Sequence, residues 1–344
     1  MRNLFKAKVS IPLIVLLALV ISIAVVNYYA VQHLNQEKKK AVKEALSKID
    51  HVSQRLLPRE RYKHIRPLLF VEYKREDTLL LKIKKDIMDF IKQKQDAGVI
   101  RNASAYLRLL NHHQDVRINP SEIYFPGSLM KVPMLISFLK EAESNPAYLD
   151  KSISFDAPFS NLPNQNIKGK NIEVGKSYSF RELLHYMIVY SDNNATALLG
   201  NNIDFEKLSR VFEDLALPPI IAGYQDYAIS LKDYSRFFRC LYNASYLSWD
   251  MSEYALDLLS KCTYSNGLKR YLPDTIKVAY KFGERNLEGI QQLHEMGIVY
   301  LGEQTYLVGI MTKGKDVKAL EDFIADVSKI IFDYFVKEGK SIDK

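Results

Sequence analysis

The sequence predicts an α/β protein of the α+β class, with an antiparallel sheet that carries helices and an all-helical subdomain beside it. One observation is a strand pattern at residues 104–110. A second is a pair of apolar runs, 296–301 and 306–312, around a Gly302-Glu-Gln turn, which indicates a hairpin. The third is a long stretch, residues 140–275, whose patterns are mostly helical. Strands at both ends with helices between them favour a sheet beside a helical lobe.

The globular part of the chain begins near Arg75 with an amphipathic helix that Gly98 ends. After the first strand the chain turns at the His112-His113 pair, and a second strand must run up to Tyr124. Adjacent histidines can indicate a metal ion, but no other ligands follow at metal-site spacing, so turn residues are the better interpretation. The amphipathic pattern of residues 319–336 predicts a closing helix.

The first residues contain an almost wholly apolar stretch, Val9 to Val31, which is long enough to span a membrane as a helix. A cleavable signal peptide is the alternative, but its apolar region would be shorter and would end at small residues, whereas Asn27-Tyr-Tyr-Ala30 is a poor cleavage site. We therefore expect residues 1–31 to be a cytoplasmic tip and an uncleaved transmembrane signal anchor. Residues 32–74 are then a basic helical stalk or linker, and residues 75–344 the globular domain.

The net charge of +8 is unevenly distributed along the chain. Residues 32–101 hold 18 basic and 10 acidic residues, whereas residues 102–344 hold 27 basic and 30 acidic ones. A solvated stalk is the simpler interpretation of this basic segment, and attraction to anionic lipid or cell-wall polymer is the alternative. Nucleic acid is not an expected partner, because the globular domain shows no alternation of basic and aromatic residues typical of such a surface.

Cys240 and Cys262 are the only cysteines. Outside the cytoplasm they could pair, but two residues define no disulfide framework, and each could equally be a small buried apolar side chain. The sequence contains no Gly-rich phosphate loop and no dinucleotide fingerprint, so no cofactor is expected.

A short stretch, Phe125-Pro-Gly-Ser128-Leu-Met-Lys131, places a serine at the start of a helix. Pro126 and Gly127 interrupt what precedes, and apolar residues then recur at helical spacing, so Ser128 lies in the first turn beside free backbone N–H groups. Lys131 follows three residues later and projects from the same face, where its amine can activate the hydroxyl as a neighbouring base. An ordinary amphipathic helix with one surface lysine is the alternative.

Two other places match the same Ser-x-x-Lys pattern, Ser137 to Lys140 and Ser341 to Lys344. Ser341 follows every other element of the domain. Ser137 lies inside the helix, where its hydroxyl would bond backbone carbonyls rather than a substrate. Neither is as good a candidate nucleophile as Ser128.

Two further motifs follow along the chain. Ser179 and Glu182 form a capping-box signature ahead of an apolar helix face, and Ser191-Asp192-Asn193 ends that helix. The segment Ile276–Gly283 alternates as a strand and carries Lys281 at its end. Each motif alone is also a plausible cap or strand end.

Together, the order Ser-x-x-Lys, Ser-Asp-Asn and Lys-Phe-Gly resembles the three-motif set of penicillin-binding proteins and class A β-lactamases. The resemblance covers roughly residues 75–338 and includes the order of the elements. It implies a β-lactamase-like fold and a serine acyl-enzyme mechanism. Ser128 would attack an acyl carbonyl, Lys131 would act as the base, and Ser191 would relay a proton to the leaving nitrogen.

The same resemblance implies substrate-binding residues. Asn193 would hold the substrate amide, and Lys281 would supply positive charge beside the substrate carboxylate. The backbone N–H groups of Ser128 and Glu284 would form the oxyanion hole, and Gly283 lets a ligand pass close to the backbone. Asp192, the middle residue of the Ser-Asp-Asn motif, is expected to have a structural part and no catalytic one.

Two departures from the family pattern matter. Phe282 stands where the family has Thr or Ser, and it cannot donate a hydrogen bond to a substrate carboxylate; Arg285 or Arg270 is the candidate substitute donor. The loop glutamate that activates the hydrolytic water in class A β-lactamases is also missing. Only Glu253-Tyr-Ala-Leu-Asp257 faintly resembles that loop, too far along the chain, and residues 218–230 look like a shortened version. Deacylation is therefore expected to be slow.

Three interpretations remain. The favoured one is an extracytoplasmic serine hydrolase, anchored in the cell membrane by one span, that forms an acyl-enzyme with β-lactams or cell-wall D-alanyl peptides. A membrane-anchored pseudoenzyme that binds peptidoglycan is the second. The third is a scaffold whose basic stalk and helix contact a partner. The orientation follows from the substrate, since basic residues flank both sides of the apolar stretch.

Overall fold

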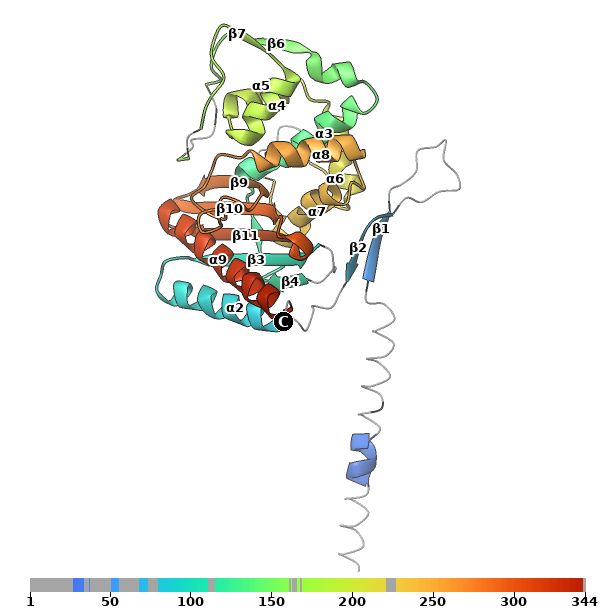
Figure 1. Ribbon diagram of the computed structural model, residues 1–344, viewed down its shortest axis with the longest axis vertical. Coiled ribbons are helices and arrows are strands. Elements are labelled where there is room, and N and C mark those ends of the chain that lie inside the picture. Colours follow the sequence, from blue (N-terminus) through green and yellow to red (C-terminus); the bar gives the residue numbers. More distant parts are fainter. Residues whose placement is uncertain are drawn as a thin grey trace, which may run out of the picture. The chain divides into compact units, whose positions relative to one another are not determined.

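The computed structural model describes residues 27–33, 37, 51–55, 68–73, 80–110, 115–160, 162, 166–167, 169–220 and 227–342 (Figure 1). Most of the expected membrane segment, most of the stalk and the His112-His113 pair lie outside these residues. Residues 27–33 are helical, and within the described ranges no helix is both long and apolar enough to cross a membrane. Strands β1 (His51–Arg55) and β2 (Leu68–Tyr73) form a small two-stranded sheet.

The remaining elements follow in chain order. They are α2 (Leu81–Asp96), β3 (Asn102–Leu109), β4 (Asp115–Ile118), β5 (Ile123–Tyr124), the 3₁₀ helix η1 (Gly127–Met130), α3 (Lys131–Ala142), η2 (Pro146–Asp150), β6 (Ser152–Phe155), β7 (Lys176–Ser179), α4 (Phe180–Val189), α5 (Asn193–Gly200), α6 (Phe205–Asp214), β8 (Ile229–Ser230), α7 (Leu231–Tyr242), α8 (Trp249–Ser260), β9 (Val278–Leu287), β10 (Ile290–Val299), η3 (Gly302–Gln304), β11 (Tyr306–Gly314) and α9 (Val317–Ile342).

The central sheet is antiparallel and has the strand order β4-β3-β11-β10-β9. Helices α2 and α9 pack together and against one face of it (Figure 1). Apolar side chains of both helices, such as Ile87 and Phe323, share a core with strand residues such as Tyr280 and Val308. The predicted α+β arrangement of an antiparallel sheet with helices on it is confirmed.

The other core lies on the opposite face of the sheet, where α3, α4, α7 and α8 contribute buried apolar residues. Leu135 of α3, Leu184 of α4 and Phe237 of α7 belong to it, as does Met311 of β11. The expected helical subdomain is therefore present. It also contains the small sheets β5-β8 and β6-β7, which were not expected. Pairing of such short strands depends on contacts between distant segments, which local periodicity does not encode.

The second strand differs from the expectation. It ends at Ile118 instead of running to Tyr124, because Asn119 turns the chain in the left-handed region with φ of 49°. Tyr124 then pairs with Ile229 of β8, outside the central sheet. The consequence is that the chain leaves the sheet before it reaches Ser128.

Strand β9 is longer than the sequence indicates, so Lys281 lies inside it instead of at its end. The apolar alternation stops at Phe282, yet the backbone stays paired with β10 as far as Leu287 opposite Ile290. The hairpin turn at Glu288 and Gly289 has positive φ at both residues, as a tight two-residue turn requires. Backbone pairing with β10 therefore continues beyond the last residue of the apolar pattern.

The two cysteines are both buried and both free. Cys240 lies in α7 within one core, and Cys262 follows α8 in the other. They behave as the small apolar side chains that the sequence allowed as one of its alternatives, and the structure contains no disulfide between them.

Candidate active site

Ser128 lies in the 3₁₀ turn η1, and α3 continues directly from it at Lys131. The turn packs tightly against β9. A Cβ added to Gly127 would lie 2.2 Å from the Glu284 carbonyl oxygen, and one added to Gly283 would lie 2.2 Å from the Pro126 carbonyl oxygen. Both positions therefore require glycine, and their close approach brings the backbone of Glu284 beside the turn that holds Ser128.

Two side chains of β10 hold the backbone of Phe125, which lies two residues before this turn. Gln292 Oε1 accepts from the Phe125 backbone N–H at 3.1 Å, and His294 Nε2 lies 3.1 Å from the Phe125 carbonyl oxygen. The backbone N–H of Thr312 donates to His294 Nδ1 at 3.2 Å, which leaves Nε2 as the protonated nitrogen that donates. Burial lowers the pKa of His294 to about 3, so the ring is neutral. Sequence reasoning missed this clamp.

On the C-terminal side of Ser128, a tyrosine holds the backbone of the same turn. Tyr234 of α7 is completely buried, and its hydroxyl donates to the carbonyl oxygen of Leu129 at 2.8 Å. Together with the clamp on Phe125, this bond restrains the backbone on both sides of Ser128. The hydroxyl of half-buried Ser128 itself makes no hydrogen bond with any described residue.

Lys131 is the centre of the polar contacts around Ser128. Its Nζ donates to the Ser191 carbonyl oxygen at 2.6 Å, to Ser191 Oγ at 3.1 Å and to Asn193 Oδ1 at 2.8 Å. The side chain is buried, and this burial, assisted by the charge of Lys281, lowers its pKa well below the usual value for lysine. Asp192 and Glu284 act in the opposite direction. A lysine with a lowered pKa can lose its proton and act as a base near neutral pH.

The Ser-Asp-Asn motif connects two helices. The capping box of Ser179 and Glu182 starts α4 as predicted, with Ser179 Oγ accepting from the Glu182 backbone N–H at 3.2 Å. Ser191 follows α4 with φ of 56°, and Asp192 is the N-cap of α5. The motif therefore begins the next helix as well as ending α4.

Asp192 has backbone partners on both carboxylate oxygens. Its Oδ1 accepts from the Asn194 N–H at 2.8 Å and its Oδ2 from the Ile172 N–H at 2.7 Å. Burial raises the pKa of Asp192, while these hydrogen bonds oppose the shift. The side chain holds the turn that presents Ser191 and Asn193, in keeping with its expected structural part.

Lys281 is fully buried on the face of β9 that meets the helical subdomain. Its Nζ donates to the Phe282 carbonyl oxygen at 3.1 Å and lies 3.9 Å from the centroid of the Phe282 ring. Burial lowers the pKa of Lys281 to about 8. Lys281 is therefore close enough to Lys131 to lower its pKa. Among the described residues, Lys281 forms no hydrogen bond with Ser191.

The side chain of Glu284 adds an acid that sequence reasoning did not weigh, because only its backbone was assigned a part. Its Oε1 accepts from the Ile167 backbone N–H at 3.1 Å, and its Oε2 accepts from Asn166 Nδ2 at 3.1 Å. The side chain is half-buried, and burial raises the pKa of its carboxyl group. A carboxyl group thus lies directly after Gly283, beside the backbone that approaches Ser128.

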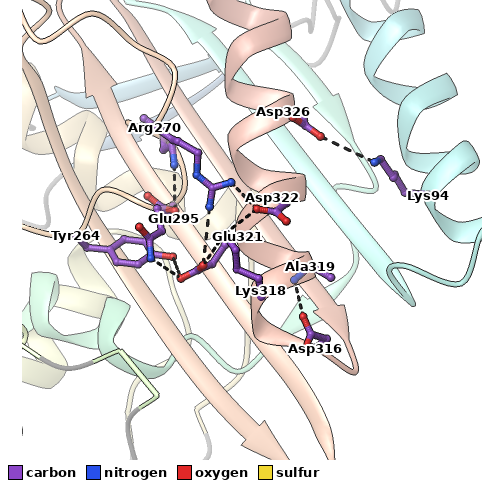
Figure 2. Close-up of polar contacts among 12 residues, drawn as sticks. Lys94, Tyr264, Arg270, Glu295, Asp316, Lys318, Ala319, Glu321, Asp322 and Asp326 are labelled. Carbon is purple, nitrogen blue, oxygen red and sulfur yellow. Dashed lines mark hydrogen bonds and ion pairs between the residues drawn. The ribbon is translucent and has the colours of Figure 1, made fainter.

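The ring of Phe282 lies against Tyr264, with ring centroids 4.4 Å apart, and is only 3% exposed. Neither candidate substitute for its missing hydrogen-bond donor is free. Figure 2 shows Arg270 paired with Asp322 of α9 at 2.5 Å, on the side of the sheet that α9 covers. Arg285 has an interaction of its own.

Two acids between the second and third motifs, Glu213 and Asp257, are paired with basic residues of their own helices. Glu213 pairs with Arg210 on α6 at 3.6 Å, and Asp257 pairs with Lys261 at the end of α8 at 2.6 Å. The Glu213 side chain is exposed and that of Asp257 is half-buried. Asp226, a third acid between the two motifs, lies outside the described residues.

Comparison with solved structures shows the fold. Similar structures include a beta-lactamase from Sphaerobacter thermophilus, a beta-lactamase from Chitinophaga pinensis and an acyl-enzyme complex of a PBP-A mutant with penicillin G. Each is 18% identical to this chain, and their TM-scores are 0.60, 0.62 and 0.62 in that order. The alignments cover 72%, 72% and 75% of this chain and 95%, 99% and 97% of the respective structures.

No curated protein is significantly similar in sequence. The sequence pattern of the beta-lactamase enzyme family, however, matches residues 82–335, which is most of the chain and includes all three motifs. The chain therefore belongs to the beta-lactamase enzyme family.

Proposed function

We propose that this protein is a serine acyl-hydrolase that forms an acyl-enzyme at Ser128 with β-lactams or cell-wall D-alanyl peptides. The proposal depends most on the hydrogen bonds of Lys131. This lysine lies three residues after Ser128, and its amine donates to Ser191 Oγ and Asn193 Oδ1. A similar fold in PBP-A holds penicillin G as an acyl-enzyme, which supports a β-lactam as one class of acyl donor. Family membership supports the hydrolase class.

In the proposed mechanism, Ser128 Oγ attacks the acyl carbonyl carbon and its proton passes to neutral Lys131. The lowered pKa of Lys131 favours that neutral form. The backbone N–H groups of Ser128 and Glu284 stabilise the oxyanion, since the glycine contacts bring these two segments together. When the tetrahedral intermediate collapses, the carbon–nitrogen bond breaks, and Ser191 passes a proton from Lys131 to the leaving nitrogen.

The test is covalent labelling. Full-length protein in detergent is incubated with a fluorescent penicillin, and the adduct is measured by intact mass. We expect one adduct per chain, its loss in Ser128→Ala, and its retention in the matched control Ser137→Ala, the serine of the competing motif in α3. Labelling that survives Ser128→Ala would overturn the assignment of the nucleophile.

We further propose that deacylation is the slow step, because the sequence lacks the loop glutamate that activates the hydrolytic water in class A β-lactamases. Rapid mixing with a chromogenic β-lactam should then give a burst of about one equivalent and slow turnover afterwards. Fast, linear turnover without a burst would mean that another carboxylate activates the water.

A second candidate, a non-catalytic peptidoglycan-binding protein, is favoured by one observation. Phe282 replaces a hydrogen-bond donor, and the Glu284 carboxyl is already bonded to Ile167 and Asn166. Peptidoglycan binding without either burst or turnover would support it.

We propose a cell-membrane location with the globular domain outside the cytoplasm, as the apolar stretch Val9 to Val31 and the cell-wall substrate suggest. Such a protein should stay in the membrane fraction after an alkaline wash, and recovery of a shortened soluble form would contradict the anchor.

A further inference from the structure

The turn that holds Ser128 rests on one pair of neighbouring residues in the central sheet. Gly283 of β9 lies opposite His294 of β10 in the β9–β10 register, so both positions face the same side of the sheet. Gly283 has no side chain, which lets the carbonyl oxygen of Pro126 approach its backbone closely. His294 instead carries a ring that reaches the backbone of Phe125. The pair thus combines close backbone approach with support from a side chain.

Both backbone polar groups of Phe125 are bonded by side chains of β10. The Phe125 N–H donates to Gln292 Oε1 at 3.1 Å, and the Phe125 carbonyl oxygen accepts from His294 Nε2 at 3.1 Å. Gln292 and His294 are only 2% and 0% exposed, so water does not compete for either bond. A backbone bonded at both its N–H and its C=O cannot rotate without losing a buried hydrogen bond. The direction of the chain is therefore fixed three residues before Ser128.

The ring of His294 is itself held by the next strand. Its Nδ1 accepts from the Thr312 N–H of β11 at 3.2 Å, and its edge packs on Tyr124, with ring centroids 5.3 Å apart. A proton on Nδ1 would oppose the Thr312 N–H, and burial lowers the pKa of His294 to about 3, so the ring stays neutral. His294 is therefore a single-tautomer donor to Phe125.

We propose that His294 is a positioning residue for the acylation step, because it holds the backbone that directs Ser128 and its N–H group toward the acyl carbonyl. The inference rests on the proposed function, in which the Ser128 N–H is one of the two oxyanion donors. Such a donor acts only when it points to the place where the charge develops, and a displacement of about 1 Å can lower the rate about 100-fold. His294 acts through Phe125 and takes no part in proton transfer.

The test compares His294→Leu with His294→Gln. Full-length protein in detergent is mixed with benzylpenicillin at several concentrations, and intact mass over time gives the limiting acylation rate constant and the half-saturating concentration. Glutamine keeps an N–H donor near the place of Nε2, whereas leucine has none. We expect His294→Leu to lower the limiting rate constant roughly 10- to 100-fold and to leave the half-saturating concentration nearly unchanged. His294→Gln should keep most of the wild-type rate constant.

A matched control separates positioning from stability. Ser328 of α9 is buried and its Oγ donates to the Leu268 carbonyl oxygen at 2.7 Å, so Ser328→Ala also leaves a buried carbonyl oxygen without its donor. Ser328→Ala should lower Tm as His294→Leu does, yet keep the wild-type acylation rate constant. Gln292→Met, which removes the acceptor of the Phe125 N–H, should lower the rate constant and serves as the test if His294→Leu fails to fold.

The tautomer of His294 is measured without any acyl transfer. In protein labelled with nitrogen-15 histidine, the ring signals lost in His294→Gln identify this residue, and we expect a neutral ring with its proton on Nε2 from about pH 8 to about pH 5. A ring protonated on both nitrogens at pH 5 overturns the inference. Acylation of His294→Leu as fast as that of Ser328→Ala overturns it as well, and leaves acyl transfer intact.

Failure of the proposed function gives a different result. Absence of any adduct in the wild type overturns acyl transfer, and with it a part for His294 in acylation. A neutral ring with its proton on Nε2 would then show that the hold of His294 on Phe125 persists without that reaction.

Discussion

The two sides of the site differ in how closely they keep the family pattern. On one side, Lys131 donates hydrogen bonds to Ser191 and Asn193, which belong to the second motif of the family. On the other side, strand β9 has Phe282 where the family has Thr or Ser; the ring packs on Tyr264, and the Glu284 carboxyl accepts from the Ile167 backbone N–H. Proton transfer requires donor and acceptor within hydrogen-bond reach, whereas recognition of a leaving group tolerates many chemistries. The lysine of the first motif therefore keeps contacts with the second motif, whereas the third motif has lost its hydrogen-bond donor.

The largest expected effect on the acylation rate comes from replacing Lys131. Lys131→Ala removes the proposed base and the contacts to Ser191 and Asn193, so the acylation rate should fall at least about 100-fold. Lys140→Ala is the matched control, since Lys140 belongs to the competing motif and only bonds Tyr246 and Glu143. Intact mass measured over time gives both rates. Equal rates in the two variants would remove Lys131 from the mechanism.

The buried carboxyl group of Glu295 in β10 should make the stability of the folded protein depend on pH. Burial raises the pKa of Glu295 to about 8, from a value of 4.5 for an unperturbed glutamate. The folded protein keeps a proton that the unfolded chain releases, so the free energy of unfolding falls as pH rises from about 4.5 to about 8.

Glu295→Gln copies the protonated acid and should abolish that fall. The variant should gain stability over the wild type as pH rises, by as much as about 5 kcal/mol above pH 8, and little at pH 4.5. Chemical denaturation at several pH values measures the difference, with Glu288→Gln as the control. A gain that does not vary with pH would show that Glu295 is ionised in the folded protein.

The smallest expected effect comes from the cap of α4, the helix that precedes Ser191. Ser179→Ala removes the cap of α4, the helix that precedes Ser191, and should cost about 1 kcal/mol, or roughly 2–3 °C in Tm. Ser177→Ala, which loses only an exposed bond to Ser154, should change Tm by less. If the acylation rate falls more than the stability loss explains, the position of Ser191 depends on the start of α4.

Short-range patterns were sufficient for the motif residues. The i, i+3 spacing of Ser128 and Lys131, the capping box of α4 and the amphipathic pattern of α9 all depend on neighbours within one or two helical turns. These features are present in the structure where the sequence predicts them. The order of the motifs was enough to predict the family.

What the sequence by itself determined is therefore the turn that holds Ser128, the lysine three residues after it and the helix that precedes Ser191. Only the tertiary structure decided that Phe282 faces Tyr264, that acids of α9 engage Arg270, and that His294 holds Phe125. Each of these contacts joins residues far apart in the chain, and its energy depends on burial and on partners that no local pattern specifies. Local spacing thus determines the motif residues, whereas packing between distant segments determines the surroundings of those residues.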